Sequence, residues 1–415
     1  MFEKEQSLIQ QQIVSILKEA QLPAEPLKWT WIPFSGHWGI ATSMFGTASA
    51  EAKSGKKVNV KERAAEIAEL VHARIQLPPE FEKVEAINGY INLYFNSDTF
   101  ARRAVDEVLE QGGDFGRGEP NGRTVMVEYS QPNTHKAFHV GHLRNMVLGS
   151  SICEIIEFAG SKVIRANYIG DIGLHVIKWL WNYMTFHNGE IPPREGMTRW
   201  MGGLYAEAVK RLEENSDLDE QMRALFKRWD ERDPEIVALW KKTRQWSLDA
   251  FDQVYSLLGI RFERIYFESD VEDSGKDIVA GLIEKGLAKD ERPEGAVIVD
   301  LDSIMGTKEK YRVLVILRSD GTSLYSTKDL SLAIQKFNEY PLDQSVYVID
   351  VRQSLYMQQI FQVMELMGYT WAKSCYHLAY EIVNLPGNVT IASREGTVVL
   401  LEDLITEAEK RARVI

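Results

Sequence analysis

The sequence predicts a doubly wound α/β protein, in which a parallel sheet carries a helical insertion and follows a small α+β domain. Three observations lead to this prediction. Short apolar segments alternate with helical ones from Thr124 onward, and residues 172–287 form a long, charged stretch with helical periodicity. A segment rich in glycine, proline and asparagine at 114–122 separates both from the N-terminal part.

Residues 1–118 are expected to form the N-terminal α+β domain. Apolar spacing and turn residues predict three helices, one strand-like stretch and one hairpin: helices over 3–19, 60–77 and 98–111, a strand over 29–39, and a hairpin over 84–95. The last helix ends at Gly112 and Gly113, just before the predicted domain boundary.

Residues 119–385 are expected to form the larger domain. Its short apolar segments have the composition of buried strands: 124–128, 162–167, 296–301, 311–317 and 345–349. A helix is predicted over 143–159, ending at Gly160. The insertion at 172–287 carries six tryptophans, which we interpret as helix-packing core rather than as stacking platforms for bases. The pattern indicates a Rossmann-type sheet, in which ligands bind beyond the carboxyl ends of the strands.

Composition excludes several classes of protein. The 415 residues are 45% apolar with a net charge of −12, which argues against a generally basic nucleic-acid coat but allows a local basic face. Cys153 and Cys375 lie far apart, so neither a disulfide framework nor a zinc site is predicted. The polar N-terminus and the absence of long apolar runs predict a cytoplasmic protein that binds neither membrane nor DNA.

The run from Glu128 to His142 is the most informative segment. It joins a strand end, a polar turn, Lys136 and the motif His139-Val140-Gly141-His142 at the start of a predicted helix. Two imidazoles at a helix N-terminus are suited to binding polyphosphate, and a glycine between them lets a nucleotide approach the backbone. The motif alone is a weak signal; the strand before it and the helix after it strengthen the interpretation.

This run, together with Leu143-Arg144-Asn145 and the segment 163–171, resembles the class I aminoacyl-tRNA synthetases and, among them, the arginyl-tRNA synthetase family. The resemblance implies an arginine–tRNA ligase, which forms arginyl-adenylate and pyrophosphate from arginine and ATP. It then transfers arginine to the 3′-terminal ribose of tRNA(Arg). The implied ligands are L-arginine, ATP with Mg²⁺, and tRNA(Arg); no zinc is implied, and we expect a monomer.

The resemblance assigns an ATP site to His139, Gly141 and His142, with Gly170 and Asp171 near the adenosine. Asp171 could equally cap the helix that follows it.

Residues 390–397 resemble the mobile K-M-S-K-S loop of the family, but both lysines are absent. Ser393 and Glu395 are expected to contact ATP, and Arg394 to supply a positive charge. Some arginyl enzymes that lack the loop lysine carry one just before the H-x-G-H motif, which is the position of Lys136. The alternative is that Lys136 is a solvated loop lysine.

The planar guanidinium of arginine has five donors, so its pocket requires carboxylates and other acceptors. Glu128 ends the first strand of the predicted sheet, and Tyr325 and Asp329 would share one helix face. These residues, with Asn133 and Gln353, match the family's substrate pocket; Asn133, Gln353 and His139 would hold the α-amino and carboxylate groups. Taken singly, Asp329 could instead be a cap or an ion pair, and Tyr325 could be core.

By the same resemblance, Tyr90 and Asn92 would contact the tRNA elbow, although both could be ordinary strand residues. Residues 386–415 are predicted to hold the loop and the start of a helical region. Because arginyl enzymes continue here into a helical anticodon-binding domain, we expect truncation. The competing hypotheses are a non-catalytic tRNA-binding relative and an H-x-G-H nucleotidyltransferase.

Overall fold

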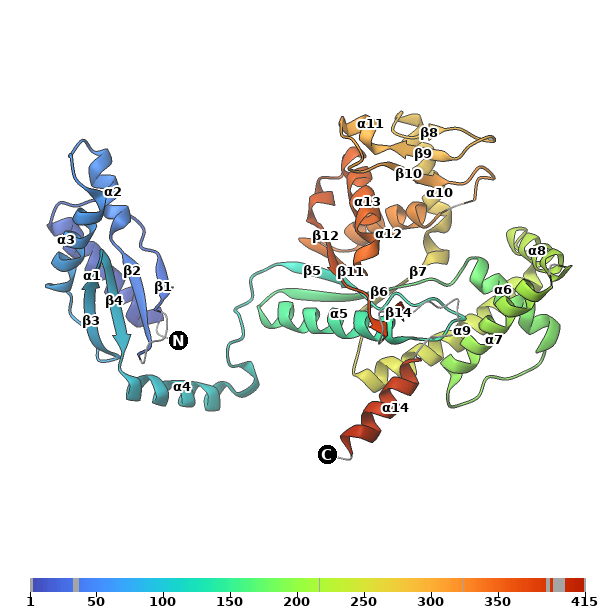
Figure 1. Cartoon of the computed structure of the whole chain (residues 1–415), viewed down its shortest axis with the longest axis horizontal. Helices are drawn as coiled ribbons and strands as arrows, with labels where there is room; N and C mark the ends of the chain where they lie inside the picture. The colour runs from blue at the N-terminus through green and yellow to red at the C-terminus, as the bar shows by residue number, and fades with distance from the viewer. Residues whose placement is uncertain are drawn as a thin grey trace. The chain divides into compact units, whose positions relative to one another are not determined.

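The computed structural model describes residues 3–32, 37–215, 217–322, 324–385, 389–390 and 400–413. The chain divides into two compact units, Met1–Arg117 and Gly118–Ile415 (Figure 1).

The first unit is built on a four-stranded antiparallel sheet of order β1-β2-β4-β3. Its elements, in chain order, are α1 (Glu3–Glu19), β1 (Trp29–Trp31), β2 (Gly39–Ser43), α2 (Phe45–Lys53), α3 (Val60–His72), β3 (Phe81–Ile87), β4 (Tyr90–Phe95) and α4 (Ser97–Gln111). Ile9 and Ile13 of α1, Ile67 of α3 and Leu93 of β4 meet in one core. The sheet therefore buries one face against these helices.

The helix predicted over 60–77 is shorter in the structure, because α3 ends at His72. The chain then leaves the helix and lies against α1. There Gln76 accepts a hydrogen bond from the Gln12 side chain and donates its backbone N–H to the Gln12 amide oxygen. This long-range pair cannot be read from local periodicity.

The second unit contains the remaining elements. Before the helical insertion come β5 (Thr124–Glu128), α5 (Val140–Phe158) and β6 (Lys162–Ile169). The insertion itself comprises α6 (Leu174–Phe186), α7 (Met197–Glu214), α8 (Asp217–Asp230) and α9 (Pro234–Leu258). After it come β7 (Arg264–Phe267), α10 (Glu268–Glu284), β8 (Lys289–Asp290), β9 (Val297–Asp300), α11 (Leu301–Met305), β10 (Val313–Leu317), α12 (Tyr325–Glu339), β11 (Gln344–Asp350), α13 (Ser354–Leu366), β12 (Cys375–Tyr380), β13 (Asn384–Leu385), β14 (Val389–Thr390) and α14 (Leu401–Ala412).

A five-stranded parallel sheet of order β12-β11-β5-β6-β7 forms the centre of this unit. The chain winds outward from β5 through β6 and β7, and then returns to β11 and β12 on the other side. Apolar residues of α5 and α9 pack on one face, and Val271 of α10 and Leu332 of α12 on the other. The predicted doubly wound α/β class is confirmed, and its switch point lies between β5 and β11.

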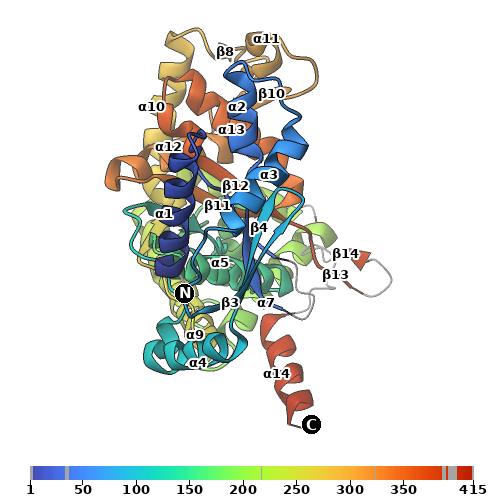
Figure 2. The same cartoon turned by 90° about the vertical axis from the view of Figure 1, so that its left-hand side faces the viewer.

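Two predicted strands have a different place. The segments 296–301 and 311–317 were expected in the parallel sheet, but β9 and β10 pair antiparallel with each other and, with β8, form a separate three-stranded sheet. In Figure 2 this sheet and α11 lie at one end of the unit, with α10 and α13. Apolar composition predicts burial of a strand but does not specify its partner.

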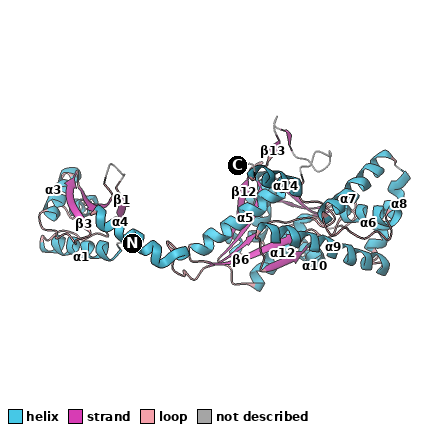
Figure 3. Ribbon diagram, turned by 90° about the horizontal axis from the view of Figure 1, so that it is seen from below, coloured by secondary structure: helices cyan, strands magenta, loops and turns pink. Residues whose placement is uncertain are grey.

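The helical insertion is also shorter than the predicted range 172–287. Its four helices α6–α9 are mutual neighbours and gather on one side of the unit (Figure 3). β7, which follows them, is parallel to β6, and α10 packs on the sheet. Four of its tryptophans, Trp179, Trp181, Trp229 and Trp240, are buried in a single core, as predicted. Among the described residues, no helix is both long and apolar enough to cross a membrane.

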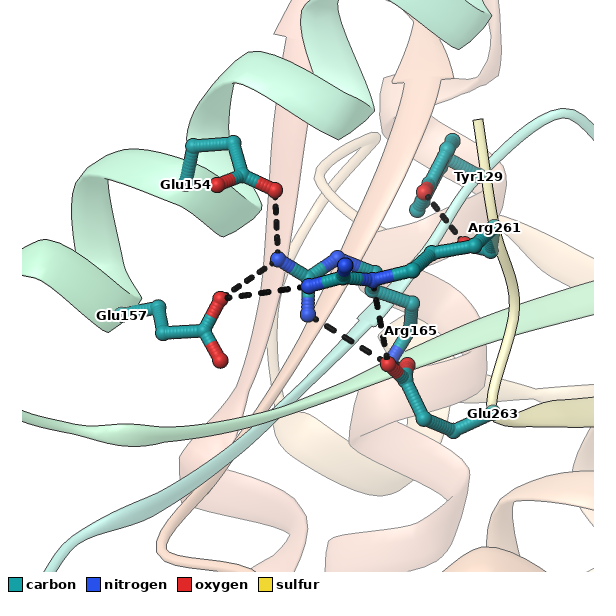
Figure 4. Close-up of polar contacts among 6 residues, drawn as sticks. All are labelled: Tyr129, Glu154, Glu157, Arg165, Arg261 and Glu263. Atoms are coloured by element: carbon teal, nitrogen blue, oxygen red, sulfur yellow. Dashed lines mark hydrogen bonds and ion pairs between the residues drawn. The ribbon is translucent and has the colours of Figure 1, made fainter. Parts of the chain in front are cut away.

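A buried arginine fastens α5 to the sheet. The Arg165 side chain on β6 is 2% exposed and pairs with Glu154 and Glu157 of α5 at 2.7 Å each (Figure 4). Glu263, which precedes β7, accepts from the Arg165 backbone N–H at 2.7 Å. The guanidinium also approaches Glu263 to 3.4 Å, so Arg165 links α5, its own strand β6 and the segment just before β7.

Candidate active site

The site lies where the strand order reverses, at the carboxyl ends of β5 and β11. Two cavities open there, of about 180 Å³ and about 410 Å³. Gln131, Ile349 and Gln353 line both, so the cavities are adjacent. This is the place where ligands bind in doubly wound sheets.

The smaller cavity surrounds the start of α5. Its polar lining includes His139, Gly141, His142 and Arg144 from this helix start, and Asp350 and Arg352 from the end of β11. Asn145 donates to the backbone oxygen of Val348 at 2.7 Å and so fixes α5 to the end of β11. A helix N-terminus, two imidazoles and two guanidinium groups are suited to an anionic ligand such as a polyphosphate.

The hydrogen bonds fix which nitrogens of the two imidazoles are free. His139 Nδ1 accepts from the backbone N–H of Gly141 at 3.1 Å, and His142 Nδ1 accepts from that of His139 at 3.2 Å. Burial lowers the pKa of both rings, strongly in His142. A neutral ring whose Nδ1 accepts carries its proton on Nε2, so each histidine retains one donor for a ligand.

Gly141 fits its place for a reason that the sequence did not indicate. A Cβ at this position would lie 2.9 Å from Cε1 of His139. The glycine thus makes room for the neighbouring imidazole, rather than only for a nucleotide.

The larger cavity contains three carboxylates on three elements. Glu128 ends β5, Glu268 begins α10, and Asp329 lies in the second turn of α12. Glu128 pairs with the buried Lys336, and Glu268 with Lys328 at 2.9 Å. Asp329 differs, because its described partner is a hydroxyl group, that of Tyr356.

The environment of Asp329 moves the ionisation of its carboxyl group close to neutral pH. Burial is the main cause that raises its pKa to about 7; Glu128 and Glu268 act in the same direction, and the hydrogen bond from Tyr356 and the charge of Lys336 act against it. Burial likewise raises the pKa of Glu268. A cation that enters the cavity would favour the ionised form of Asp329. The cavity is therefore suited to a cationic ligand.

Most of the predicted arginine contacts are brought together here. Glu128, Asn133, Tyr325, Asp329 and Gln353 all line the larger cavity, whereas His139 lines the smaller one. Tyr325 is 60% exposed, so it is not a core residue.

Two predicted contacts lie elsewhere. Gly170 lines the larger cavity rather than the smaller one. Asp171 lines neither; its buried carboxylate accepts from Arg244 and from the hydroxyl of Ser269, both at 2.7 Å. Asp171 thus holds α9 and the start of α10 to the end of β6, and the N-cap of the next helix, α6, is Gly173.

Lys136 lies beside the cavities without lining either of them. Its ammonium nitrogen is 4.9 Å from the ring centroid of Tyr205 on α7. Ser393, Arg394 and Glu395 lie outside the described residues.

In the first unit, Tyr90 is 42% exposed and Asn92 partly exposed, while Ile91 and Leu93 between and after them are buried. Tyr90 and Asn92 therefore lie on the open face of β4.

The sequence interpretation missed three residues that line the larger cavity, Tyr168, Glu268 and Tyr356, and the buried Lys336 that pairs with Glu128. Glu268 carried a usable signal, since it directly follows the strand-like run Arg264-Ile265-Tyr266-Phe267, as Glu128 follows β5. Lys336 is seven residues after Asp329, two turns along the same helix, a spacing that indicates a shared face.

A doubly wound sheet whose switch point carries a helix start suited to an anion beside an acidic cavity places the chain among α/β proteins of the Rossmann type. Residues 104–415 match the sequence model of the family described as tRNA synthetases class I (R), catalytic domain. The chain belongs to this family.

Relatives named arginine–tRNA ligase support this assignment. That of Treponema denticola is 36% identical over 360 residues, covering 85% of this chain and 60% of that protein. That of Bdellovibrio bacteriovorus is 37% identical over 336 residues, covering 79% and 56%. The chain thus spans less than two thirds of the length of these relatives.

Among solved structures, the chain is similar to Thermus thermophilus arginyl-tRNA synthetase. The TM-score is 0.71 at 23% identity, over 99% of this chain and 70% of that one. The enzyme of Plasmodium falciparum gives a TM-score of 0.65 at 21% identity, over 99% and 67%. At these identities the likeness concerns the fold.

Proposed function

We propose that the chain activates arginine with ATP and transfers it to tRNA(Arg), as an arginine–tRNA ligase. The observation that carries the proposal is the adjacency of two unlike cavities at one switch point. One presents imidazole and guanidinium donors at a helix start, and the other presents Asp329 between two carboxylates that already have lysine partners.

In the first step, a carboxylate oxygen of arginine attacks the α-phosphorus of ATP. A bond forms between this oxygen and phosphorus, and the bond to the bridging oxygen breaks, so that pyrophosphate leaves with the electron pair. Such a reaction depends on positioning and on charge stabilisation. The Nε2–H groups of His139 and His142 would donate to phosphate oxygens, and neither ring needs to remove a proton.

In the same step, the larger cavity would orient arginine. Asp329 would accept the guanidinium after losing its proton, and Tyr325 would cover the aliphatic stem. Asn133, which lines the larger cavity, and Gln353, which lines both cavities, would hold the α-amino and carboxylate groups. This arrangement directs the substrate carboxylate toward the phosphate cavity. Lys136 would then supply positive charge to the departing pyrophosphate.

Mg²⁺ would enter as the complex with ATP. Among the described ranges no group of three or more histidine, cysteine or acidic side chains is arranged to hold a metal ion, so we assign it no protein ligands. For the second step, Tyr90 and Asn92 are candidate contacts to tRNA. Translation would place the protein in the cytoplasm.

The first test is calorimetric titration with a non-hydrolysable arginyl-adenylate analogue, beside its lysyl and glutamyl counterparts. We expect tight binding of the arginyl analogue alone, because only a planar fork of donors matches the acidic cavity. Arginine-dependent ATP–pyrophosphate exchange, with and without tRNA(Arg), then tests catalysis. Absence of binding by all three analogues would contradict the proposal and favour a non-catalytic tRNA-binding relative.

A further inference from the structure

The loop of residues 134–137, just before the H-x-G-H motif, is held by two helices of the insertion. On the α9 side, His135 is the anchor. Its backbone N–H donates to Ser247 Oγ at 2.9 Å, and its Nε2 lies 2.8 Å from Thr243 Oγ1. Both hydroxyl residues belong to α9, and all three residues are buried.

Both imidazole nitrogens of His135 have hydroxyl partners in this anchor. Thr243 Oγ1, the partner of Nε2, also lies 3.0 Å from the backbone oxygen of Leu239 and 3.2 Å from that of Trp240 on its own helix. On the other side of the ring, Nδ1 lies 2.9 Å from Thr134 Oγ1, which is 3.3 Å from the backbone oxygen of Gly170. The ring is therefore held from both sides by hydroxyl groups. Burial holds the pKa of His135 well below its usual value, so the ring is neutral.

On the α7 side, the loop packs so closely against Gly202 that a side chain at this position would not fit. A Cβ on Gly202 would lie 2.5 Å from Ala137 Cβ and 2.9 Å from the Ala137 backbone nitrogen. One turn further along α7, Tyr205 places its ring 4.9 Å from the ammonium nitrogen of Lys136. The helix thus meets both the backbone of the loop and its one cationic side chain.

The backbone of the loop needs such support. His135 has a φ of +62°, a conformation that non-glycine residues rarely adopt and that persists only where surrounding contacts impose it. A lysine in a loop also has many rotamers, most of which would place its ammonium group away from a leaving group.

We propose that α7 and α9 position Lys136 for the reaction, with Gly202, Tyr205 and Thr243 as the positioning residues. The role of Lys136 toward pyrophosphate rests on the proposed function; the hold on its loop rests on the contacts above. The insertion would then be part of the machinery for activation, rather than only a packing unit beside the sheet.

The test compares Gly202→Ala with Gly203→Ala. Both replace a helical glycine of α7 by alanine, but a Cβ on Gly203 meets nothing within 4 Å. We expect Gly202→Ala to weaken ATP binding and to lower kcat of arginine-dependent pyrophosphate exchange by about tenfold, with the arginine KM unchanged. Gly203→Ala should match the wild type in both measurements. Tyr205→Leu, which removes the ring but keeps an apolar side chain, is the second variant and should act in the same direction.

Each variant is also made with Lys136→Ala. If the helices act through Lys136, Gly202→Ala and Tyr205→Leu should have little further effect in that background. Equal effects with and without Lys136, or wild-type ATP affinity in both variants, would overturn the inference.

ATP affinity is measured by calorimetry on the full chain in the absence of arginine. If the wild-type protein shows no arginine-dependent pyrophosphate exchange, the proposed function is contradicted. In that case the ATP affinities of the variants, compared with that of the wild type, still decide the inference. Hydrogen exchange of the peptide containing 134–137 adds an independent reading. Thr243→Val should speed this exchange, and unchanged protection would count against the anchor.

Discussion

Asp329 is the residue on which the specificity of the larger cavity depends. Two of the three carboxylates in the cavity have lysine partners on α12, and only Asp329 is held by a neutral hydroxyl group. A bound guanidinium would therefore gain most from this side chain. Burial, with Glu128 and Glu268 acting in the same direction, explains why the pKa of this carboxyl group is raised to about 7.

Asp329→Ala is expected to weaken arginine binding by about 2–4 kcal/mol, because the buried guanidinium would lose its charged acceptor. Calorimetric titration with arginine measures this change. The affinity for ATP, which binds in the neighbouring cavity, should stay within about twofold and serves as the control. Unchanged arginine affinity would remove Asp329 from the substrate site.

The raised pKa of Asp329 also predicts how stability depends on pH. The folded protein holds this proton up to pH of about 7, whereas the unfolded chain releases it near 3.8, so the free energy of unfolding falls as pH rises between these values. Asp329→Asn removes this loss and keeps an acceptor for Tyr356. The variant should exceed the wild type by about 1–4 kcal/mol at pH 8 and equal it near pH 3.5. Urea denaturation at the two pH values measures the difference in the free energy of unfolding. A variant that is less stable than the wild type at pH 8 would contradict the raised pKa of the buried carboxyl group.

Among the elements, α5 begins at the smaller cavity, and Arg165 of β6 forms ion pairs with two of its carboxylates. The guanidinium is buried, but the carboxylates that it binds are between 38% and 63% exposed. Their desolvation is therefore incomplete, and the pairs are expected to stabilise the protein more than a fully buried network would.

Arg165→Met keeps the aliphatic stem and removes the charge, which leaves Glu154, Glu157 and Glu263 close together without a cation. We expect a loss of about 1–3 kcal/mol in the free energy of unfolding, measured in urea. Arg261→Met is the matched control, since Arg261 approaches Glu157 and Glu263 only to 3.9 Å and 3.8 Å and is 68% exposed. It should change stability by less than about 0.5 kcal/mol. Equal losses in the two variants would show that burial of Arg165 is irrelevant.

Local signals were sufficient where an element is defined by its own residues. β5 has the predicted bounds, 124–128, because an apolar run ends at a carboxylate. α5 begins three residues earlier than predicted, since His139 itself serves as the N-cap. A histidine side chain that accepts from a helix N–H is not among the usual cap residues, so composition did not indicate it.

Pairing partners explain the remaining differences. β7 returns to the sheet by pairing with β6, which precedes the whole insertion in the sequence, and β9 pairs with the nearby β10 instead of joining the parallel sheet. The same holds in the site. The spacing of Tyr325 and Asp329 predicted a shared face. In contrast, no residue near Glu128 in the sequence indicates that Lys336, 208 residues away, donates to one of its carboxylate oxygens. Residues that line the larger cavity were easier to predict than the buried residues that pair with them.

At the scale of the whole molecule, the chain consists of two units with separate cores. Ile9, Ile67 and Leu93 belong to the core of the first unit, and every residue of the two cavities belongs to the second. A unit with its own core can in principle fold alone. The second unit therefore contains all the described residues that our proposal assigns to arginine and ATP.

A chain that begins at Gly118 and ends at Ile415 is accordingly expected to bind the arginyl-adenylate analogue within about threefold of the affinity of the full chain. If the shorter chain binds tRNA(Arg) more weakly than the full chain, the cause should be the missing residues 1–117, because Tyr90 and Asn92 lie there on the open face of β4. Calorimetry measures the first quantity, and filter binding of tRNA(Arg) the second.

Within the full chain, Tyr90→Ala together with Asn92→Ala should weaken tRNA binding and leave the affinity for the analogue unaffected, because both side chains project from the face opposite the core. Analogue binding that fails in the shorter chain, while its circular dichroism shows a folded protein, would mean that residues 1–117 contribute to the activation site.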